Sequence, residues 1–379
     1  MSTRAAAGSM LTLCALAACV RPAEERTLDD LDVGVAEAEG LSIEIEQGAA
    51  QVRTLRADEI RLWAQQPVLR GRLRPAPDSA AAAVTLTVEN CMPGAELRAR
   101  DAAGAPVEVV EVGGERPTMC RFELAPPPGQ ETALELAPPD AGTASRFRFA
   151  AMGDIQTALP SVDEMFERIN QEPDLRFVFS MGDLVEDGRL DEYDLLLAQL
   201  ERLDIPYFST IGNHELRANI DRWHDLFGRY NVHFTFKGAA FSMVDSGNAS
   251  LDPLVYDWLD EWTSAAAGGV HVFGTHYPPI DPVGVRQGSF RSRKEAAKLL
   301  ALLAGGHVDL TLYGHIHSYY AYSNAGIPAY ISGGGGALPE KFDGIGRHFL
   351  VVEVDPARGI DSVGVVRVDE PDERGERGE

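Results

Sequence analysis

Residues of the types that bind metal ions recur in the second half of the chain. They include two aspartates, a glutamine, an asparagine and three histidines: Asp154, Gln156, Asp183, Asn213, His276, His315 and His317. Carboxylate and amide oxygens combined with imidazole nitrogens suit divalent first-row metals, and no cysteine stands among them to favour a structural zinc site. The pattern predicts a site for a pair of divalent cations.

Each of these residues closely follows an apolar run that is typical of a buried β-strand. The expected strands are 147–152, 177–181, 207–211, 270–275 and 310–313. Amphipathic stretches between them predict helices at 161–169, 190–203, 253–262 and 292–303, the first with Ser161 and Glu164 as a capping box. Alternation of strands and helices predicts an α/β domain with its chemistry at the strand ends.

Two regions before residue 147 have a different sequence pattern. From residue 41 to about 136, short alternating runs such as 41–45 and 84–88 are separated by proline and glycine, which predicts a small all-β sandwich. A helical pattern appears there only at 57–66, and 125–142 is rich in proline and alanine, as linkers are. We therefore expect a β-sandwich domain at 41–142, a catalytic domain at 146–368 and a charged tail at 369–379.

The ordered motifs resemble those of the calcineurin-like metallophosphoesterases, a superfamily that includes purple acid phosphatases and many bacterial phosphodiesterases. The resemblance covers roughly 147–368. It rests on the motifs Gly153-Asp154, Gly182-Asp183, Gly212-Asn213-His214 and Gly314-His315-Ile316-His317. It implies a four-layer α/β/β/α fold in which two mixed sheets pack face to face between helices. It also implies hydrolysis of a phosphate mono- or diester by a metal-bridging hydroxide, with Mn, Fe or Zn as the two metals.

The resemblance assigns the ligands residue by residue. The first metal would be held by Asp154, Asp183 and His317. The second would share Asp183 and add Asn213, His276 and His315. His214 would donate a proton to the leaving oxygen or stabilise its charge, and Arg217 is close enough in sequence to contact the phosphate.

Two positions depart from the family pattern. Gln156 stands where most relatives have histidine; its carbonyl oxygen suits hard cations such as Mn²⁺ or Mg²⁺ better than soft ones. Alternatively, the Gln156 amide caps the following helix and does not contact metal. Glu186 stands where many relatives have aspartate, so either Glu186 or Asp187 is expected to orient His214.

The N-terminus reads as an export signal. Residues 1–18 combine Arg4 with an apolar stretch that is too short to span a bilayer. Leu16-Ala17-Ala18-Cys19 resembles a bacterial lipobox, which implies a lipid-anchored protein of the cell envelope; the alternative is an ordinary secretory peptide with Cys19 incidental. The acidic stretch 19–40 is expected to be a disordered tether.

Cys91 and Cys120 remain as a pair after the signal is removed. In an oxidising compartment they are expected to form a disulfide; the alternative is two separately buried thiols.

The composition of the chain argues against some classes of function. The 379 residues carry a formal net charge of −24, which argues against broad clamping of nucleic acid and against a nuclease. A small phosphate ester and, through lipid, the membrane are the expected partners; the sequence does not indicate an oligomeric state. The rival hypothesis is a non-catalytic, surface-anchored binding protein with a weakened metal site, for which Gln156 is the only support.

Overall fold

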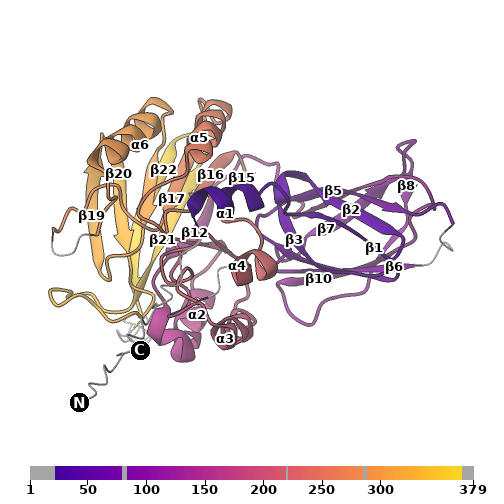
Figure 1. Cartoon of the computed structure of the whole chain (residues 1–379), viewed down its shortest axis with the longest axis horizontal. Coiled ribbons are helices and arrows are strands. Elements are labelled where there is room, and N and C mark those ends of the chain that lie inside the picture. The colour runs from indigo at the N-terminus through magenta and orange to yellow at the C-terminus, as the bar shows by residue number, and fades with distance from the viewer. Residues whose placement is uncertain (1–21, 79–82, 219–220, 285–287, 369–379) are drawn as a thin grey trace, which may run out of the picture.

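The computed structural model describes residues 22–78, 83–218, 221–284 and 288–368. The expected signal peptide, Cys19 and the charged tail at 369–379 lie outside these residues. Within the described ranges, no helix combines the length and apolar character that a membrane crossing requires. The chain forms an N-terminal β-domain beside a larger α/β domain (Figure 1).

Two sheets make up the β-domain. The six-stranded sheet has the order β1-β2-β5-β11-β7-β8, and the five-stranded sheet has the order β3-β4-β6-β10-β9. The strands are β1 (Val35–Ala38), β2 (Leu41–Ile45), β3 (Ala50–Leu55), β4 (Glu59–Ala64), β5 (Leu69–Pro75), β6 (Val84–Glu89), β7 (Glu96–Arg100), β8 (Pro106–Val107), β9 (Val109–Glu111), β10 (Met119–Leu124) and β11 (Thr132–Ala137). Strict alternation of buried and exposed residues in β5 shows that one face of its sheet packs inward, as a sandwich requires.

Two expectations for this domain are wrong. The helical pattern at 57–66 is strand β4, which pairs with β3 and β6; its buried residues lie against the sandwich core, so tertiary packing overrides a weak helical spacing. The linker expected at 125–142 contains β11, which lies between β5 and β7. Its Thr-Ala-Leu-Glu-Leu-Ala sequence alternates burial like the strands beside it.

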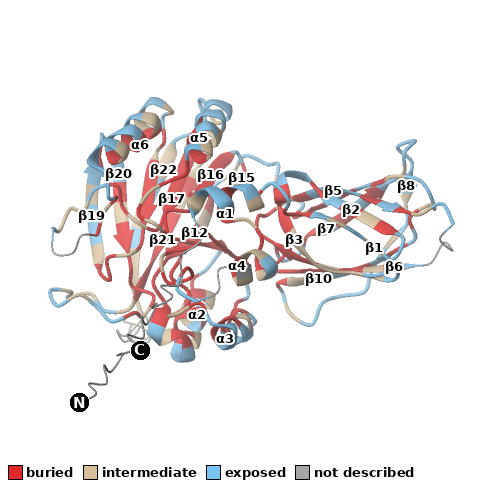
Figure 2. Cartoon of the chain, viewed as in Figure 1, coloured by how far each residue is buried: buried red, intermediate tan, exposed pale blue. Residues whose placement is uncertain are grey.

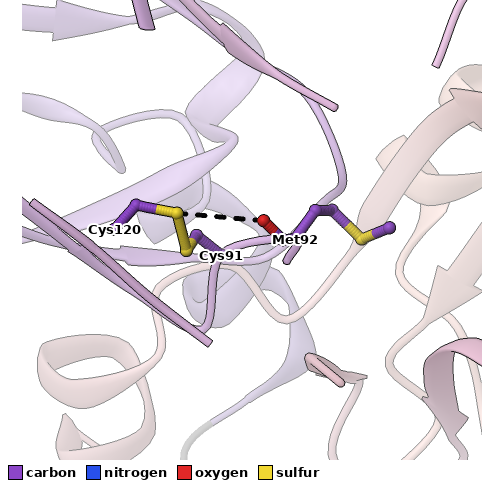
Figure 3. The surroundings of a disulfide bond; sticks show 3 residues. All are labelled: Cys91, Met92 and Cys120. Atoms are coloured by element: carbon purple, nitrogen blue, oxygen red, sulfur yellow. Dashed lines mark hydrogen bonds between the residues drawn. A yellow bond between two sulfur atoms is a disulfide. The ribbon is translucent and has the colours of Figure 1, made fainter. Parts of the chain in front are cut away.

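Cys91 and Cys120 form a disulfide within this domain (Figure 3), with their Cα atoms 6.2 Å apart. Cys120 lies on β10, and Cys91 stands two residues after the end of β6, the antiparallel neighbour of β10. The expected pairing is present, and it ties the ends of two adjacent strands.

The α/β domain also contains two sheets, ordered β14-β13-β12-β21-β22 and β15-β16-β17-β18-β20-β19. The strands are β12 (Phe147–Met152), β13 (Leu175–Ser180), β14 (Tyr207–Ser209), β15 (Val232–Phe236), β16 (Ala239–Val244), β17 (Val270–Thr275), β18 (Leu310–Tyr313), β19 (Tyr319–Asn324), β20 (Ile327–Ser332), β21 (His348–Asp355) and β22 (Gly359–Arg367). Strands β12, β13 and β14 are parallel, as are β16, β17, β18 and β20, while β15, β19, β21 and β22 pair antiparallel.

Helices cover the outer faces of these sheets (Figure 1). The helices are η2 (Gln156–Ser161), α2 (Asp163–Asn170), α3 (Leu190–Leu200), α4 (Asp221–Leu226), α5 (Pro253–Ala265) and α6 (Arg293–Gly305). Residues of the central strands are mostly buried (Figure 2). Between the sheets, Phe149 stacks on Phe177 at 5.5 Å and meets Phe241 edge-on at 5.3 Å. The predicted four-layer fold with two mixed sheets is confirmed.

The capping box expected for α2 is wrong. The helix begins at Asp163, its N-cap is Val162, and Ser161 instead donates its hydroxyl proton to the carbonyl of Ala158. The reason is that residues 156–161 form the short helix η2, which takes Ser161 into its own last turn.

The tether expected at 19–40 is wrong from residue 22 onward. Helix α1 (Ala23–Asp29) lies beside α5 of the α/β domain, and β1 joins the first sheet of the β-domain. Arg26 and Asp30 are 0% and 1% exposed. The acidic composition of this segment does not favour order by itself. Arg26 and Asp30 are nevertheless buried, because they pair with Asp245 and Asn231 in the α/β domain.

Candidate metal centre

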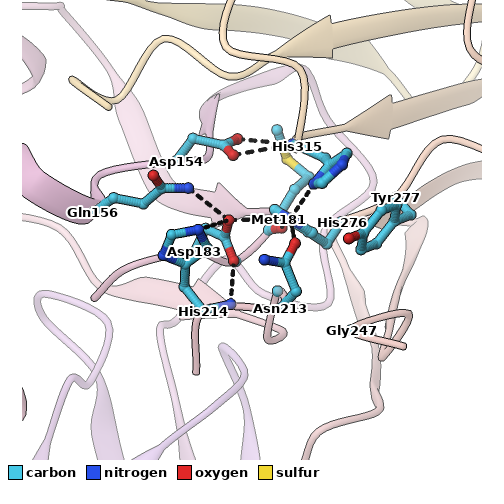
Figure 4. Close-up of polar contacts among 12 residues, drawn as sticks. Asp154, Gln156, Met181, Asp183, Asn213, His214, Gly247, His276, Tyr277 and His315 are labelled. Carbon is cyan, nitrogen blue, oxygen red and sulfur yellow. Dashed lines mark hydrogen bonds and ion pairs between the residues drawn. The ribbon is translucent and has the colours of Figure 1, made fainter. Parts of the chain in front are cut away.

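The candidate ligands collect where parallel strands of both sheets end. Asp154, Asp183 and Asn213 follow β12, β13 and β14 of one sheet. His276 follows β17, and His315 and His317 follow β18 of the other sheet. Because the two sheets pack face to face, the loops from both meet at one rim (Figure 4).

The backbone at this rim is held in unusual conformations. Asp154, Asp183 and His315 have φ angles of 66°, 56° and 67°, a region that costs energy for residues other than glycine. Gly212 must be glycine because a Cβ there would collide with the carboxylate of Asp183. Tight turns of this kind let short side chains from different strands converge.

Two groups of side chains each place their ligand atoms within 4.8 Å of one another. The first contains Asp154, Asp183 and His317, and the second contains Asp183, His276 and His315. Asp183 belongs to both, so its carboxylate could bridge two cations. Burial raises the pKa of Asp183, but His276 and the backbone N–H of His214 outweigh burial and hold that pKa well below its usual range.

His276 shows why the second group fits a cation. Its Nδ1 lies 2.9 Å from the carbonyl of Met181, which can only accept, so Nδ1 carries the proton and Nε2 presents a lone pair. That lone pair faces three atoms that can also carry lone pairs, each at 3.2 Å: Asp183 Oδ2, Asn213 Oδ1 and His315 Nδ1. A proton or a metal ion must stand among them. Burial lowers the pKa of His276, but the facing carboxylate of Asp183 raises it to about 9 overall.

The first group has the same character. His317 donates Nδ1–H to the carbonyl of Leu338 at 2.7 Å, so its Nε2 faces Asp154 Oδ1 at 3.4 Å as an acceptor. Gln156 is 5% exposed, and its amide nitrogen lies 2.7 Å from Asp183 Oδ2 and 3.1 Å from His317 Nε2. Rotation of this amide would present its oxygen at the same place. The side chain therefore points into the site and does not cap the following helix.

His214 lies at the edge of both groups. Its Nδ1 donates to the carbonyl of Glu186 at 2.6 Å, and its Nε2 accepts from Arg217 Nη2 at 2.8 Å while lying 3.8 Å from Asp183 Oδ2. The Glu186 carboxylate is 3.5 Å from Nδ1. Asp187 pairs instead with Arg189 at 2.6 Å and approaches Arg217 at 3.6 Å. The structure thus places Glu186, chiefly through its backbone carbonyl, against His214.

Glu215 is a site residue that the sequence analysis missed. Its carboxylate is 0% exposed and accepts backbone N–H groups of Leu184 (2.6 Å), Gly212 (2.7 Å), Asp183 (3.1 Å) and Val185 (3.4 Å). It therefore ties the loop after β13 to the loop after β14. Burial, helped by the charge of Asp183, raises the pKa of Glu215 to about 7. The available signal was a carboxylate directly after His214.

Comparison with known proteins shows which family the α/β domain resembles. Residues 147–319 match the family described as calcineurin-like phosphoesterase. A 3′,5′-cyclic-nucleotide phosphodiesterase from Nostoc is 25% identical over 39% of this chain and 58% of its own length. A probable glycerophosphodiester phosphodiesterase from Arcobacter nitrofigilis is 24% identical over 43% of this chain and 64% of its own length. The chain thus matches less than two thirds of each relative.

Among solved structures, a purple acid phosphatase from yellow lupin superposes with a TM-score of 0.51 at 15% identity, covering 82% of this chain and 79% of that chain. At this identity the likeness concerns the fold alone. Together, the comparisons support the predicted resemblance: residues 147–319 match the calcineurin-like phosphoesterases, a family of hydrolases that use divalent metals, and the two sequence relatives bear phosphodiesterase names.

Proposed function

We propose that this protein is an exported, metal-dependent phosphoesterase that hydrolyses a phosphate mono- or diester at a dinuclear site. The observation that carries the proposal is the pair of ligand groups that share Asp183. In each group, lone pairs of carboxylate and imidazole atoms face one another, which is the arrangement that cations stabilise. The two metals are expected to be Mn, Fe or Zn ions.

Each group of ligands would hold one of these two ions. Asp154, Asp183, His317 and the amide of Gln156 would hold the first, and Asp183, Asn213, His276 and His315 the second. Bound cations would supply positive charge for the phosphate oxygens and for the attacking nucleophile. Two backbone carbonyls fix the tautomers of these histidines. The carbonyl of Met181 accepts from His276 and that of Leu338 accepts from His317, so each histidine presents Nε2 to the site.

His214 and Arg217 would act on the substrate. The hydrogen bond to the carbonyl of Glu186 leaves His214 Nε2 free of its own proton and able to take one, and to return it to the leaving oxygen. Arg217 is 44% exposed, so its guanidinium is accessible to a phosphate oxygen. Its bond to His214 Nε2 would be exchanged for a bond to substrate.

Export and membrane anchoring are part of the proposal. The disulfide between Cys91 and Cys120 supports an oxidising compartment. The lipobox-like sequence ending at Cys19 supports a lipid anchor in the cell envelope of a bacterium. Nucleic acid is not proposed as a partner, because the net charge of −24 opposes it.

The test compares hydrolysis of a nitrophenyl phosphate monoester and the matching diester after loading with Mn²⁺, Fe²⁺ or Zn²⁺. Asp183→Asn serves as the blank, because it removes the shared ligand of both groups. Activity well above this blank is expected, and the phosphodiesterase names of the two sequence relatives favour the diester. Metal binding without hydrolysis of either ester would favour the binding-protein hypothesis instead.

A further inference from the structure

Helix α1 and its C-cap residue, Asp30, insert two charged side chains into the α/β domain. Arg26 donates Nε–H to Asp245 Oδ2 at 2.6 Å, and its Nη2 lies 2.6 Å from the same oxygen. One turn later, Asp30 accepts the backbone N–H of Tyr230 at 2.7 Å and both the backbone and side-chain N–H of Asn231, at 3.0 and 2.9 Å. Because residues four apart share one face of a helix, both charges point into the domain.

Asn231 closes these contacts into a ring. Its side-chain oxygen accepts the backbone N–H of Asp245 at 2.9 Å, while its side-chain nitrogen donates to Asp30. Arg26, Asp30, Asn231 and Asp245 are all at most 2% exposed. A carboxylate as deeply buried as that of Asp245 is stable only while its guanidinium partner stays in place.

The turn that begins at Asp245 touches the loops that carry metal ligands. Asp245 Oδ1 accepts the N–H of Gly247, and a Cβ on Gly247 would lie only 2.8 Å from the carbonyl of Gly212, the residue before Asn213. Ser246 Oγ accepts the N–H of Tyr277 at 2.8 Å, directly after His276. Figure 4 shows Gly247 and Tyr277 beside Asn213 and His276. The Tyr277 ring in turn packs against His315 at a tilt of 32°, with 3.7 Å between ring centroids.

We propose that Arg26 and Asp245 are positioning residues for the second metal site. The N-terminal helix holds the turn 245–247, and that turn sets the loops of Asn213 and His276. The contacts of this turn lie with the residues beside Asn213 and His276, which are ligands of the second group. The inference rests on the proposed dinuclear function, because it concerns one of that site's two metals.

The test titrates the full chain with Mn²⁺ alone, by calorimetry and by the spin-coupling signal of paired Mn²⁺ in electron paramagnetic resonance. His276→Ala and His317→Ala first identify which binding step belongs to which group. Arg26→Ala is expected to weaken the second-group step about tenfold or more and to reduce the paired signal, with the first-group step little changed. Arg26→Lys, which keeps the charge but not the forked geometry, should restore part of the affinity.

Asp140→Ala is the matched control. Asp140 pairs with Arg176 at 2.6 Å and with Lys237 at 2.7 Å, near the starts of β13 and β16, which is the end opposite to the metal site. It should lower stability without changing either Mn²⁺ step. Equal Mn²⁺ affinities in wild type and Arg26→Ala, or the same loss in Asp140→Ala, would overturn the inference.

Ser246→Ala provides a second route if Arg26→Ala does not fold. It removes only the hydroxyl that accepts from Tyr277, so a smaller loss confined to the second-group step is expected, and no loss would overturn the inference. Failure of the proposed function is distinguishable, because then wild type itself would bind no pair of Mn²⁺ ions and hydrolyse neither ester.

Discussion

Replacing Glu215 by glutamine tests whether this buried carboxylate holds the two catalytic loops together. The change preserves the size of the side chain and exchanges one acceptor oxygen for an NH₂ donor. In the wild type, one carboxylate oxygen accepts the backbone N–H groups of Leu184 (2.6 Å) and Val185 (3.4 Å), and the other accepts those of Gly212 (2.7 Å) and Asp183 (3.1 Å). In either orientation, the new NH₂ group would face two backbone donors.

The expected loss follows from those two donors. A buried N–H left without an acceptor costs about 1–3 kcal/mol, so Glu215→Gln should lower the free energy of unfolding by about 2–6 kcal/mol. Relief of the repulsion between Glu215 and Asp183 offsets part of this. Because Asp183 and Asn213 stand in the loops concerned, Mn²⁺ affinity should also fall, by about 10–100-fold.

Equilibrium unfolding in urea, followed by tryptophan fluorescence, measures the first effect, since Trp223, Trp258 and Trp262 lie in the α/β domain. Calorimetric titration with Mn²⁺ measures the second. Glu167→Gln, at a surface side chain that is 63% exposed, is the control and should change stability by no more than about 0.5 kcal/mol. If Glu215→Gln matched this control in both assays, the role assigned to Glu215 would be refuted.

Three further changes have defined outcomes. His214→Ala should leave Mn²⁺ affinity unchanged and lower kcat about 10²–10⁴-fold, by calorimetry and steady-state kinetics, and a loss of metal would contradict its assignment to the substrate. Gln156→His should raise affinity for Zn²⁺ more than for Mg²⁺ in competition titrations, whereas an equal gain would show that this side chain is no ligand. Burial raises the pKa of Asp30 to about 6, despite the nearby charge of Arg229. Wild-type stability should therefore decrease by about 3 kcal/mol as pH rises from about 4 through 6, and Asp30→Asn should remove this decrease; a persisting slope would assign it to another group.

The strands that carry the ligands could be predicted because their signal is local. Parallel strands buried on both faces read as continuous apolar runs, and the runs at 147–152, 270–275 and 310–313 coincide with β12, β17 and β18. A polar residue soon after such a run lies at the strand's carboxyl end whatever the rest of the fold does. This is why Asp154, His276 and the paired histidines His315 and His317 could be placed at one rim.

What could not be predicted depends on contacts between distant residues. Arg26 and Asp245 are separated by 219 positions, and nothing near Arg26 in sequence marks it as buried. The orientation of His214 is set by a backbone carbonyl, which every residue possesses and no residue type can reveal. Strand β4 shows the same limit, since its weak helical spacing is overridden by pairing with β3 and β6.

Binding of cations at the rim is expected to stabilise the native fold. Asp154 and Asp183 are each 0% exposed, so their charges depend on partners within the site. The unfolded chain does not assemble these ligands, so a cation that binds the native rim shifts the folding equilibrium by about 2.7 kcal/mol at a free concentration 100 times its Kd. Mn²⁺ should therefore raise the unfolding midpoint of wild type and a chelator should reverse the gain. Asp183→Asn should show neither effect, because both ligand groups lose the residue that they share; an undiminished Mn²⁺ response in that variant would mean that the cations bind elsewhere.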